Sequence, residues 1–143
     1  MRTQTRSIIY RTITCVMIIG ALLLTGCAQQ ELSEQFDEET VEAQALKCVE
    51  LFNEKDYQTL IDMGDETLQN AITEEKFAEA SDPYLEKCGT FSEIEKTIIF
   101  GSSNKSTNME YACVVMIGNY ENGKIQFTIS FDQDMKLVQF VIK

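Results

Sequence analysis

The chain has 143 residues, contains no histidine and carries a formal net charge of −11. Without histidine it lacks the commonest general base, the Ser-His and Cys-His catalytic pairs and every histidine-containing metal site. Its acidic residues repel phosphate groups, which disfavours nucleic-acid binding and leaves solubility as the simplest role of the charge.

The first 26 residues have the pattern of a bacterial signal peptide. The only arginines, Arg2, Arg6 and Arg11, lie before an apolar run over residues 13–24. About a dozen apolar residues are too few to span a bilayer, because a spanning helix needs roughly 20. We therefore expect this segment to direct export and to be removed.

The end of this segment, Leu24-Thr25-Gly26-Cys27, resembles the bacterial lipobox, in which an aliphatic residue and two small residues precede a cysteine. The resemblance implies cleavage before Cys27 and acylation of this residue with diacylglyceryl and palmitate-type chains, which together anchor a protein stably. The expected location is the extracytoplasmic face of the cell membrane. Gly26 and Ala28 are also spaced as an ordinary signal peptidase prefers, and cleavage by that enzyme would instead release a soluble protein.

Residues 27–36 are expected to form a short polar tether, and residues 37–143 suit one compact domain. The mature chain carries all 23 acidic residues against nine lysines, a net charge of −14. Because anionic headgroups repel such a surface, we expect the domain to stand off the membrane while the tether keeps it nearby.

The first half of the domain has helical periodicity. Over residues 37–55, apolar side chains recur every three or four residues, which predicts an amphipathic helix. Asp56 is the expected N-cap of a short second helix that closes at Gly64. The apolar positions of the first helix are Val41, Ala45, Cys48, Val49 and Phe52.

Two further helical segments are expected before the sequence changes period. Asp65 and Thr73 are candidate caps of a third helical region. Asp82-Pro83 predicts the start of one more helical turn, with proline at the first helical position, and Gly89 predicts its end.

The second half predicts four short strands rich in β-branched and aromatic residues. Asn122-Gly123 favours a type I′ hairpin turn, which would pair Gly118 with Phe127 and Met116 with Ile129. The four predicted strands are Ile94 to Phe100, Tyr111 to Tyr120, Ile125 to Phe131 and Leu137 to Ile142.

A two-residue turn at Asp134-Met135 would place Val138, Phe140 and Ile142 on the same apolar face as the preceding strand. The opposite face is half polar. The fold class predicted is α+β, with N-terminal helices packed on a curved four-stranded antiparallel sheet.

This order of elements resembles a small uncharacterised family of bacterial secreted and lipoprotein domains with a nuclear transport factor two-like, cystatin-like fold. The residues that carry the resemblance are Phe52-Asn53-Glu54-Lys55-Asp56-Tyr57, Thr73-Glu74-Glu75 and Gly89-Thr90-Phe91, within a span from Val41 to Ile142. The resemblance implies a cone-shaped domain that binds small molecules, dimerises through its sheet or, in some members, catalyses isomerisation or dehydration. Met135 departs from the pattern, because glycine would suit the last hairpin better.

No catalytic or metal site is expected. A histidine-free enzyme would need a carboxylate beside a tyrosine, such as Tyr57, Tyr84 or Tyr120, in an apolar cavity, but the inward sheet face offers no acid. Helix capping and turn formation explain the remaining acidic clusters better than calcium does, so no metal or cofactor is predicted. Those clusters are Asp62, Asp65 and Glu66, and Asp132 with Asp134.

Three cysteines, Cys48, Cys88 and Cys113, remain beside Cys27 in the mature chain, and buried reduced thiols are the expected state. The first functional hypothesis is a non-catalytic, membrane-anchored module that binds a small apolar ligand or acts as an accessory protein. Its candidate pocket residues are Tyr57, Met116, Phe127 and Phe140.

The alternatives are a protein-interaction or homodimerisation module, and an isomerase or dehydratase of the same fold. The interaction module would use the outer sheet face, where a bridge between two copies of Cys113 would mark a homodimer. The candidate interface residues are Tyr111, Cys113, Val115, Ile117 and Val141.

Overall fold

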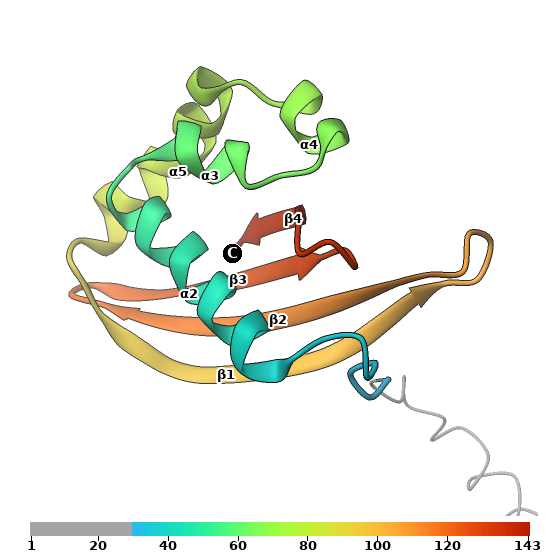
Figure 1. The fold of residues 1–143 in the computed structure, drawn as a ribbon. Coiled ribbons are helices and arrows are strands. Elements are labelled where there is room, and N and C mark those ends of the chain that lie inside the picture. The colour runs from blue at the N-terminus through green and yellow to red at the C-terminus, as the bar shows by residue number, and fades with distance from the viewer. Residues whose placement is uncertain (1–29) are drawn as a thin grey trace, which may run out of the picture.

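The computed structural model describes residues 30–143, so the predicted signal peptide and the predicted lipidation site Cys27 lie outside the described residues. The fold is α+β: within this part of the chain, four helices precede a four-stranded antiparallel sheet (Figure 1). The helices are α2 (Glu38–Asn53), α3 (Tyr57–Asp62), α4 (Glu66–Ala71) and α5 (Glu74–Cys88), and the strands are β1 (Phe91–Asn104), β2 (Met109–Tyr120), β3 (Gly123–Phe131) and β4 (Leu137–Ile142).

Helix α2 confirms the predicted amphipathic helix. Asp37 caps it, because its carboxylate accepts hydrogen bonds from the Thr40 amide at 2.9 Å and hydroxyl at 2.6 Å. These bonds favour the charged carboxylate and lower the pKa of Asp37. All five predicted apolar positions of the helix are buried.

The other predicted caps are also confirmed. Asp56, Asp65 and Thr73 each accept a hydrogen bond from the backbone amide three residues later, at the starts of α3, α4 and α5. The third helical region is therefore two helices, which meet at Ile72 in an extended conformation.

The predicted helix start at Pro83 is wrong. Pro83 lies inside α5, which runs unbroken from Glu74 to the predicted end at Gly89. Proline lacks the amide proton that an internal helical position uses, so local preference opposes this arrangement. Burial of Phe77, Ser81 and Cys88 along one side of α5 shows that tertiary packing outweighs it.

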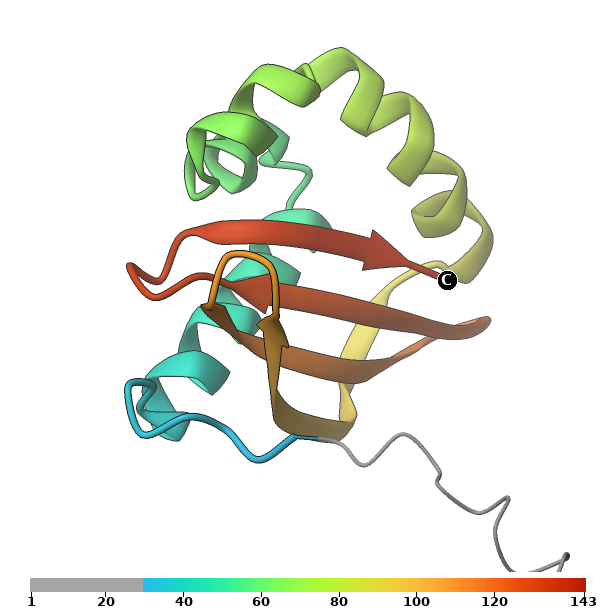
Figure 2. The same cartoon turned by 90° about the vertical axis from the view of Figure 1, so that its right-hand side faces the viewer.

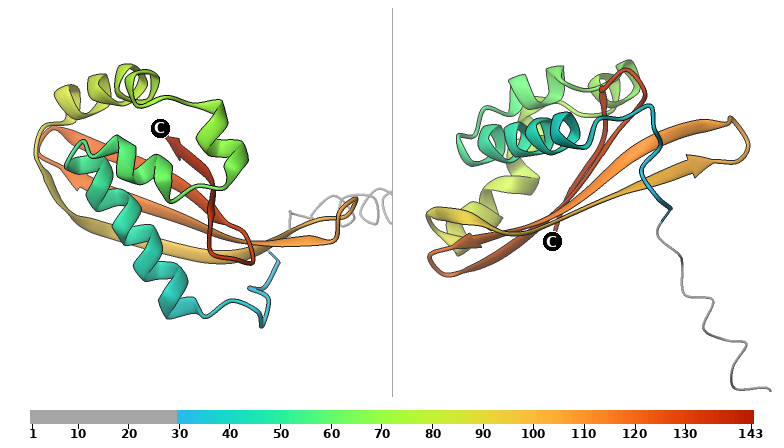
Figure 3. Two further views of the ribbon diagram at one scale, coloured as in Figure 1. Left: turned by 45° about the horizontal axis from the view of Figure 1, so that its top comes forward. Right: turned by 60° about the horizontal axis from the view of Figure 1, so that its bottom comes forward.

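The strands form a meander in the order β1-β2-β3-β4 (Figure 2). β1 and β2 run further than predicted at the end where they meet, so their hairpin projects beyond the helices (Figure 3). The sheet curves, and the helices cover its concave face.

The hairpin between β2 and β3 differs from the predicted register by two residues. Its loop is Glu121-Asn122, and Gly123 is already paired. The tip is held by the Glu121 amide, which donates to the Thr90 carbonyl at 2.9 Å, and by the Asn122 amide, which donates to the Cys88 carbonyl at 2.8 Å. These tertiary bonds outweigh the local preference of Asn-Gly for the turn. The observed pairs include Val114 with Ile129, Met116 with Phe127 and Gly118 with Ile125.

Because side chains alternate along a strand, a shift of two residues leaves each one on its predicted face. The pairing of β3 with β4 sets Phe140 opposite Ile129 and Ile142 opposite Phe127, which confirms the predicted face for these two residues of β4.

The prediction that Val138 lies on the inward face of β4 is wrong. A register shift pairs Phe131 with Leu137, which is 1% exposed. The predicted two-residue turn is instead a longer loop, in which the Asp132 carboxylate accepts from the amides of Asp134 and Lys136 at 2.9 and 2.8 Å. Met135 lies within this loop at a φ of 58°. Val138 is the extra residue of β4 at this shift, between Leu137, which pairs with Phe131, and Gln139, which pairs with Ser130.

The core lies between the helices and the concave sheet face. Phe52 of α2 packs edge-on against Phe127, with ring centroids 5.3 Å apart, and also contacts Phe140 at 5.8 Å. Tyr57 stacks beside Phe77 at 5.1 Å. These rings fill the space between the layers.

Residues 30–36, which the sequence assigns to the tether, lie along the β1–β2 hairpin. The Gly101 amide donates to the Gln30 carbonyl at 2.7 Å, and Phe36 is buried. Within residues 30–143, no helix has both the length and the apolar character needed to cross a bilayer.

Candidate functional site

An apolar groove of about 450 Å³ lies between the helices and the edge strand β4. Helices α3, α4 and α5 arch above β4 (Figure 2). Residues of these elements line the groove. Its lining residues are Leu60, Ile61, Asp65, Thr67, Leu68, Ala71, Ile72, Phe77, Leu137, Val138, Gln139 and Phe140.

The chain itself closes one end of the groove. The Leu137 amide donates to the Met63 carbonyl at 2.9 Å, and the Asp65 amide donates to the Leu137 carbonyl at 3.0 Å. Asp65 also caps α4 through a 2.8 Å bond from the Leu68 amide. The carboxylate at the groove therefore has a structural role.

The edge of β4 supplies polar backbone groups beside the groove. Gln126 and Lys143 exchange both backbone hydrogen bonds at 3.0 Å, so they form a hydrogen-bonded pair of the antiparallel ladder. Such pairs alternate with non-bonded ones, which directs the amide and carbonyl groups of Phe140 and Ile142 away from β3. These groups lie on the open edge of the sheet.

The structure places only one of the four predicted pocket residues in this groove. Phe140 lines it, whereas Tyr57, Met116 and Phe127 are 2%, 0% and 0% exposed within the core. Leu68, Ile72 and Phe77 also line the groove, and none of them was predicted as a site residue.

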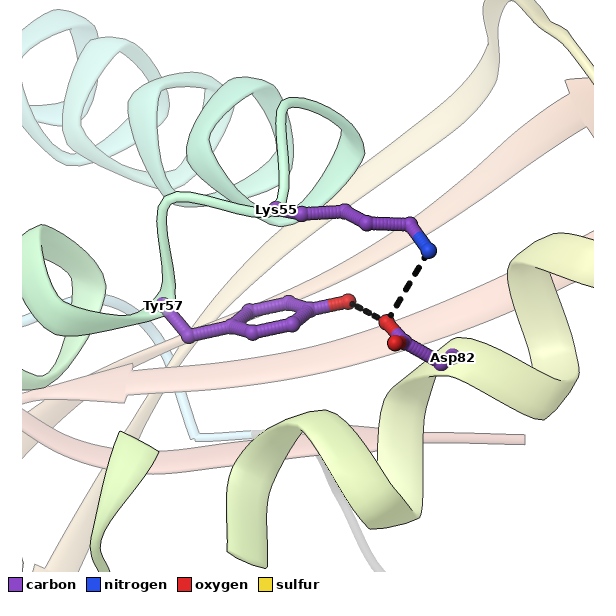
Figure 4. Close-up of polar contacts among 3 residues, drawn as sticks. All are labelled: Lys55, Tyr57 and Asp82. Carbon is purple, nitrogen blue, oxygen red and sulfur yellow. Dashed lines mark hydrogen bonds and ion pairs between the residues drawn. The ribbon is translucent and has the colours of Figure 1, made fainter. Parts of the chain in front are cut away.

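A second polar cluster joins the α2–α3 connection to α5 (Figure 4). The Tyr57 hydroxyl donates to the Asp82 carboxylate at 2.7 Å, and the Lys55 ammonium lies 3.2 Å from the same oxygen. Burial and then the bond to Asp82 raise the pKa of Tyr57, while that bond and Lys55 lower the pKa of Asp82. Both donors contact the same oxygen of Asp82, and the lowered pKa makes this carboxylate a weak general base, so the cluster acts as a clasp.

The other tyrosines considered for catalysis lie apart from any such pair. Tyr120 donates to Asn53 Oδ1 at 2.6 Å, and burial raises its pKa. Tyr84 is 38% exposed on α5. None of the described residues form a group of three or more cysteine, aspartate or glutamate side chains suited to a metal ion.

The outer sheet face carries all five predicted interface residues. Cys113 is only 8% exposed and accepts a hydrogen bond from the Ser130 hydroxyl at 3.4 Å, whereas Val141 is 37% exposed. A shallow hollow of about 410 Å³ lies here beside Tyr111, Cys113 and Gln139. Cys48, Cys88 and Cys113 are all free and buried, which agrees with the predicted reduced thiols.

The outward positions in the middle of this face have no charged side chain. Among the paired strand residues, lysines stand only at one end, and no acid lies between the rows of Lys96 and Asn104. Asp132 follows β3 next to the Tyr111 row, and its carboxylate is bonded within the β3–β4 loop. The intervening outward residues are Ile98, Phe100, Ser102, Tyr111, Cys113, Val115, Thr128, Ser130, Gln139 and Val141.

Comparisons with known proteins agree with this fold. A family model described as "Protein of unknown function (DUF3887)" matches residues 45–140. The NMR structure of a protein from Ruminococcus gnavus ATCC 29149 is similar, with 34% sequence identity, a TM-score of 0.69 and coverage of 79% of this chain and 96% of that chain. A comparison with curated proteins finds no match. The chain therefore belongs to the DUF3887 family of proteins of unknown function.

Proposed function

We propose that this protein is an extracytoplasmic lipoprotein, anchored by acyl chains on Cys27, whose folded part is a non-catalytic module that binds an apolar ligand. The lipobox-like sequence before Cys27 supports the anchor. The meander of four strands under N-terminal helices supports assignment of the domain to the nuclear transport factor two-like, cystatin-like class.

The groove beneath α3, α4 and α5 is the observation that carries the binding role. Its volume of about 450 Å³ falls within the range of small-molecule sites, and its walls are mainly aliphatic and aromatic. The open edge of β4 adds hydrogen-bonding groups, which would orient a ligand whose apolar part fills the groove.

The available side chains support a non-catalytic role. An isomerase or dehydratase of this fold needs a carboxylate free to exchange protons in an apolar cavity. Asp65, the carboxylate that lines the groove, is bonded as a helix cap, and Asp82 is 35% exposed and clasped by Tyr57 and Lys55.

A dye-binding measurement tests the groove. Nile red, a neutral apolar dye, is added to full-length protein in lipid nanodiscs, with empty nanodiscs as the blank. We expect the dye fluorescence to saturate as binding sites fill. Ile72→Asp should lower the affinity for the dye at least tenfold, because it places a charge in the apolar lining. Leu46→Asp on the exposed side of α2 is the control. Equal binding by both variants would contradict the proposed site.

Intact-mass measurement of the protein from its own membranes tests the anchor. The expected species begins at Cys27 and carries the mass of its acyl chains, and Cys27→Ser removes that added mass. A chain that begins elsewhere, or that has no acyl mass, contradicts lipidation.

A second candidate function is self-association through the outer sheet face. The middle of that face favours it, because the paired strand residues there are uncharged in a chain with 23 acidic residues. Burial of Cys113 makes a disulfide between two copies unsuitable as a marker, so sedimentation at increasing protein concentration is the appropriate measurement.

A further inference from the structure

The segment that follows the proposed lipidation site is fixed to the β1–β2 hairpin. The Gln30 carbonyl accepts the Gly101 amide at 2.7 Å, and a Cβ at Gly101 would collide with the Glu31 carbonyl oxygen. The Ser33 hydroxyl donates to Glu110 at 2.7 Å across the same hairpin. Most of the expected tether is therefore part of the folded unit.

Chain geometry then limits how far the hairpin can lie from the lipid. Three peptide steps separate Cys27 from Gln30, and they span at most about 11 Å. The strand continues from Gly101 to Asn104, a distance of about 10 Å, before it turns. The docked segment lies beside the end of the hairpin that projects beyond the helices (Figure 1). The anchor and the hairpin tip thus share one side of the molecule.

The composition of the hairpin tip suits a lipid surface. Residues 97–109 contain no acid in a chain with 23 acidic residues, and they include Lys105. Met109 is 42% exposed, and the remaining side chains of the turn are small and uncharged. Such a segment meets anionic headgroups without the repulsion that the rest of the surface would cause.

We infer that the β1–β2 hairpin tip, residues 102–109, rests on the headgroups of the anchoring membrane and turns the acidic helices away from it. This inference rests on the lipidation of Cys27 proposed above. It refines the expectation that the domain stands off the bilayer: the helical side stands off, and the hairpin tip makes contact.

The absence of tryptophan from the chain provides a direct test. Met109→Trp places a single fluorophore at the tip. Tyr84→Trp places one at a site of similar exposure, 38%, beside the β2–β3 hairpin at the other end of β2. Each full-length, acylated variant is reconstituted in phosphatidylcholine and phosphatidylglycerol vesicles with and without brominated lipid, and association is checked by flotation.

We expect brominated lipid to quench the tryptophan of Met109→Trp several-fold more than that of Tyr84→Trp. Insertion of about twenty glycine and serine residues after Ala28 lengthens the tether without touching the folded part, and should remove most of the difference. Flotation with equal quenching of the two variants overturns this inference and leaves the anchor intact. If the insertion does not reduce the quenching of Met109→Trp, the short tether is not the cause of the contact. If the chain does not float with the vesicles, the lipid anchor itself is contradicted.

Discussion

The clasp of Tyr57, Asp82 and Lys55 joins two helical segments through one carboxylate, and its contribution to stability is measurable. Tyr57→Phe removes the hydroxyl and keeps the buried ring, so the free energy of unfolding should fall by about 1 kcal/mol. Tyr84→Phe on the same helix as Asp82 is the matched control and should change stability little. Urea denaturation followed by circular dichroism compares the two, and equal losses would show that the clasp contributes nothing.

The Cys48 thiol makes stability depend on pH in the alkaline range. Burial raises its pKa from 9.0 to about 12. The pKa of this thiol is higher in the folded chain than in the unfolded chain. Its contribution to stability is therefore fully present below pH 9 and is lost as the pH rises toward 12, because between these values only the unfolded chain ionises.

Cys48→Ala should remove this dependence. Between pH 8 and pH 10, the wild-type chain should lose about 1.4 kcal/mol more of its unfolding free energy than the variant does. The pKa shifts that both proteins share, including those of Tyr57 and Tyr120, cancel in the comparison. Denaturation at the two pH values measures it, and parallel losses would contradict a buried neutral thiol.

At the scale of elements, the sequence predicted the helix caps most accurately, because a cap depends on one side chain and the backbone close to it. Asp37, Asp56, Asp65 and Thr73 cap helices because a side-chain oxygen can reach a free amide without help from tertiary structure. Pro83 was misplaced because its position depends on packing against another layer, which local preference cannot reveal.

Pro83→Ala tests how far packing outweighs local preference in α5. Alanine restores the missing amide donor, so the free energy of unfolding should rise by about 1–3 kcal/mol. Thermal and urea denaturation both measure this change. A loss of stability would mean that proline fixes a bend on which the burial of Cys88 depends.

Met135 has a left-handed backbone conformation, with a φ of 58°, in the β3–β4 loop. Its side chain also packs against the core, so glycine and alanine variants must be compared with each other. Both lose the packing, but only glycine adopts this conformation without strain, so Met135→Gly should be about 1 kcal/mol more stable than Met135→Ala. Equal denaturation midpoints would contradict strain at this position.

At the scale of the whole molecule, the fold was more predictable than the groove. Strand faces repeat every two residues, so an error of two in the β2–β3 register left the inward set intact. The groove combines residues 60–77 with residues 137–140, and its opening depends on how far α4 stands from β4. Such distances depend on side-chain packing across layers, which no local pattern encodes.

The outer sheet face gives the last prediction. If two copies associate there, Val141→Asp should weaken the dimer at least tenfold, about 1.4 kcal/mol, because it places a charge in the contact. Leu46→Asp is the matched control: both side chains are 37% exposed, but Leu46 lies on α2. Sedimentation of the full-length protein in detergent micelles measures the dissociation constant. Equal weakening by both variants would implicate general charge repulsion, and a monomer at every concentration would remove self-association and leave the groove as the remaining binding surface.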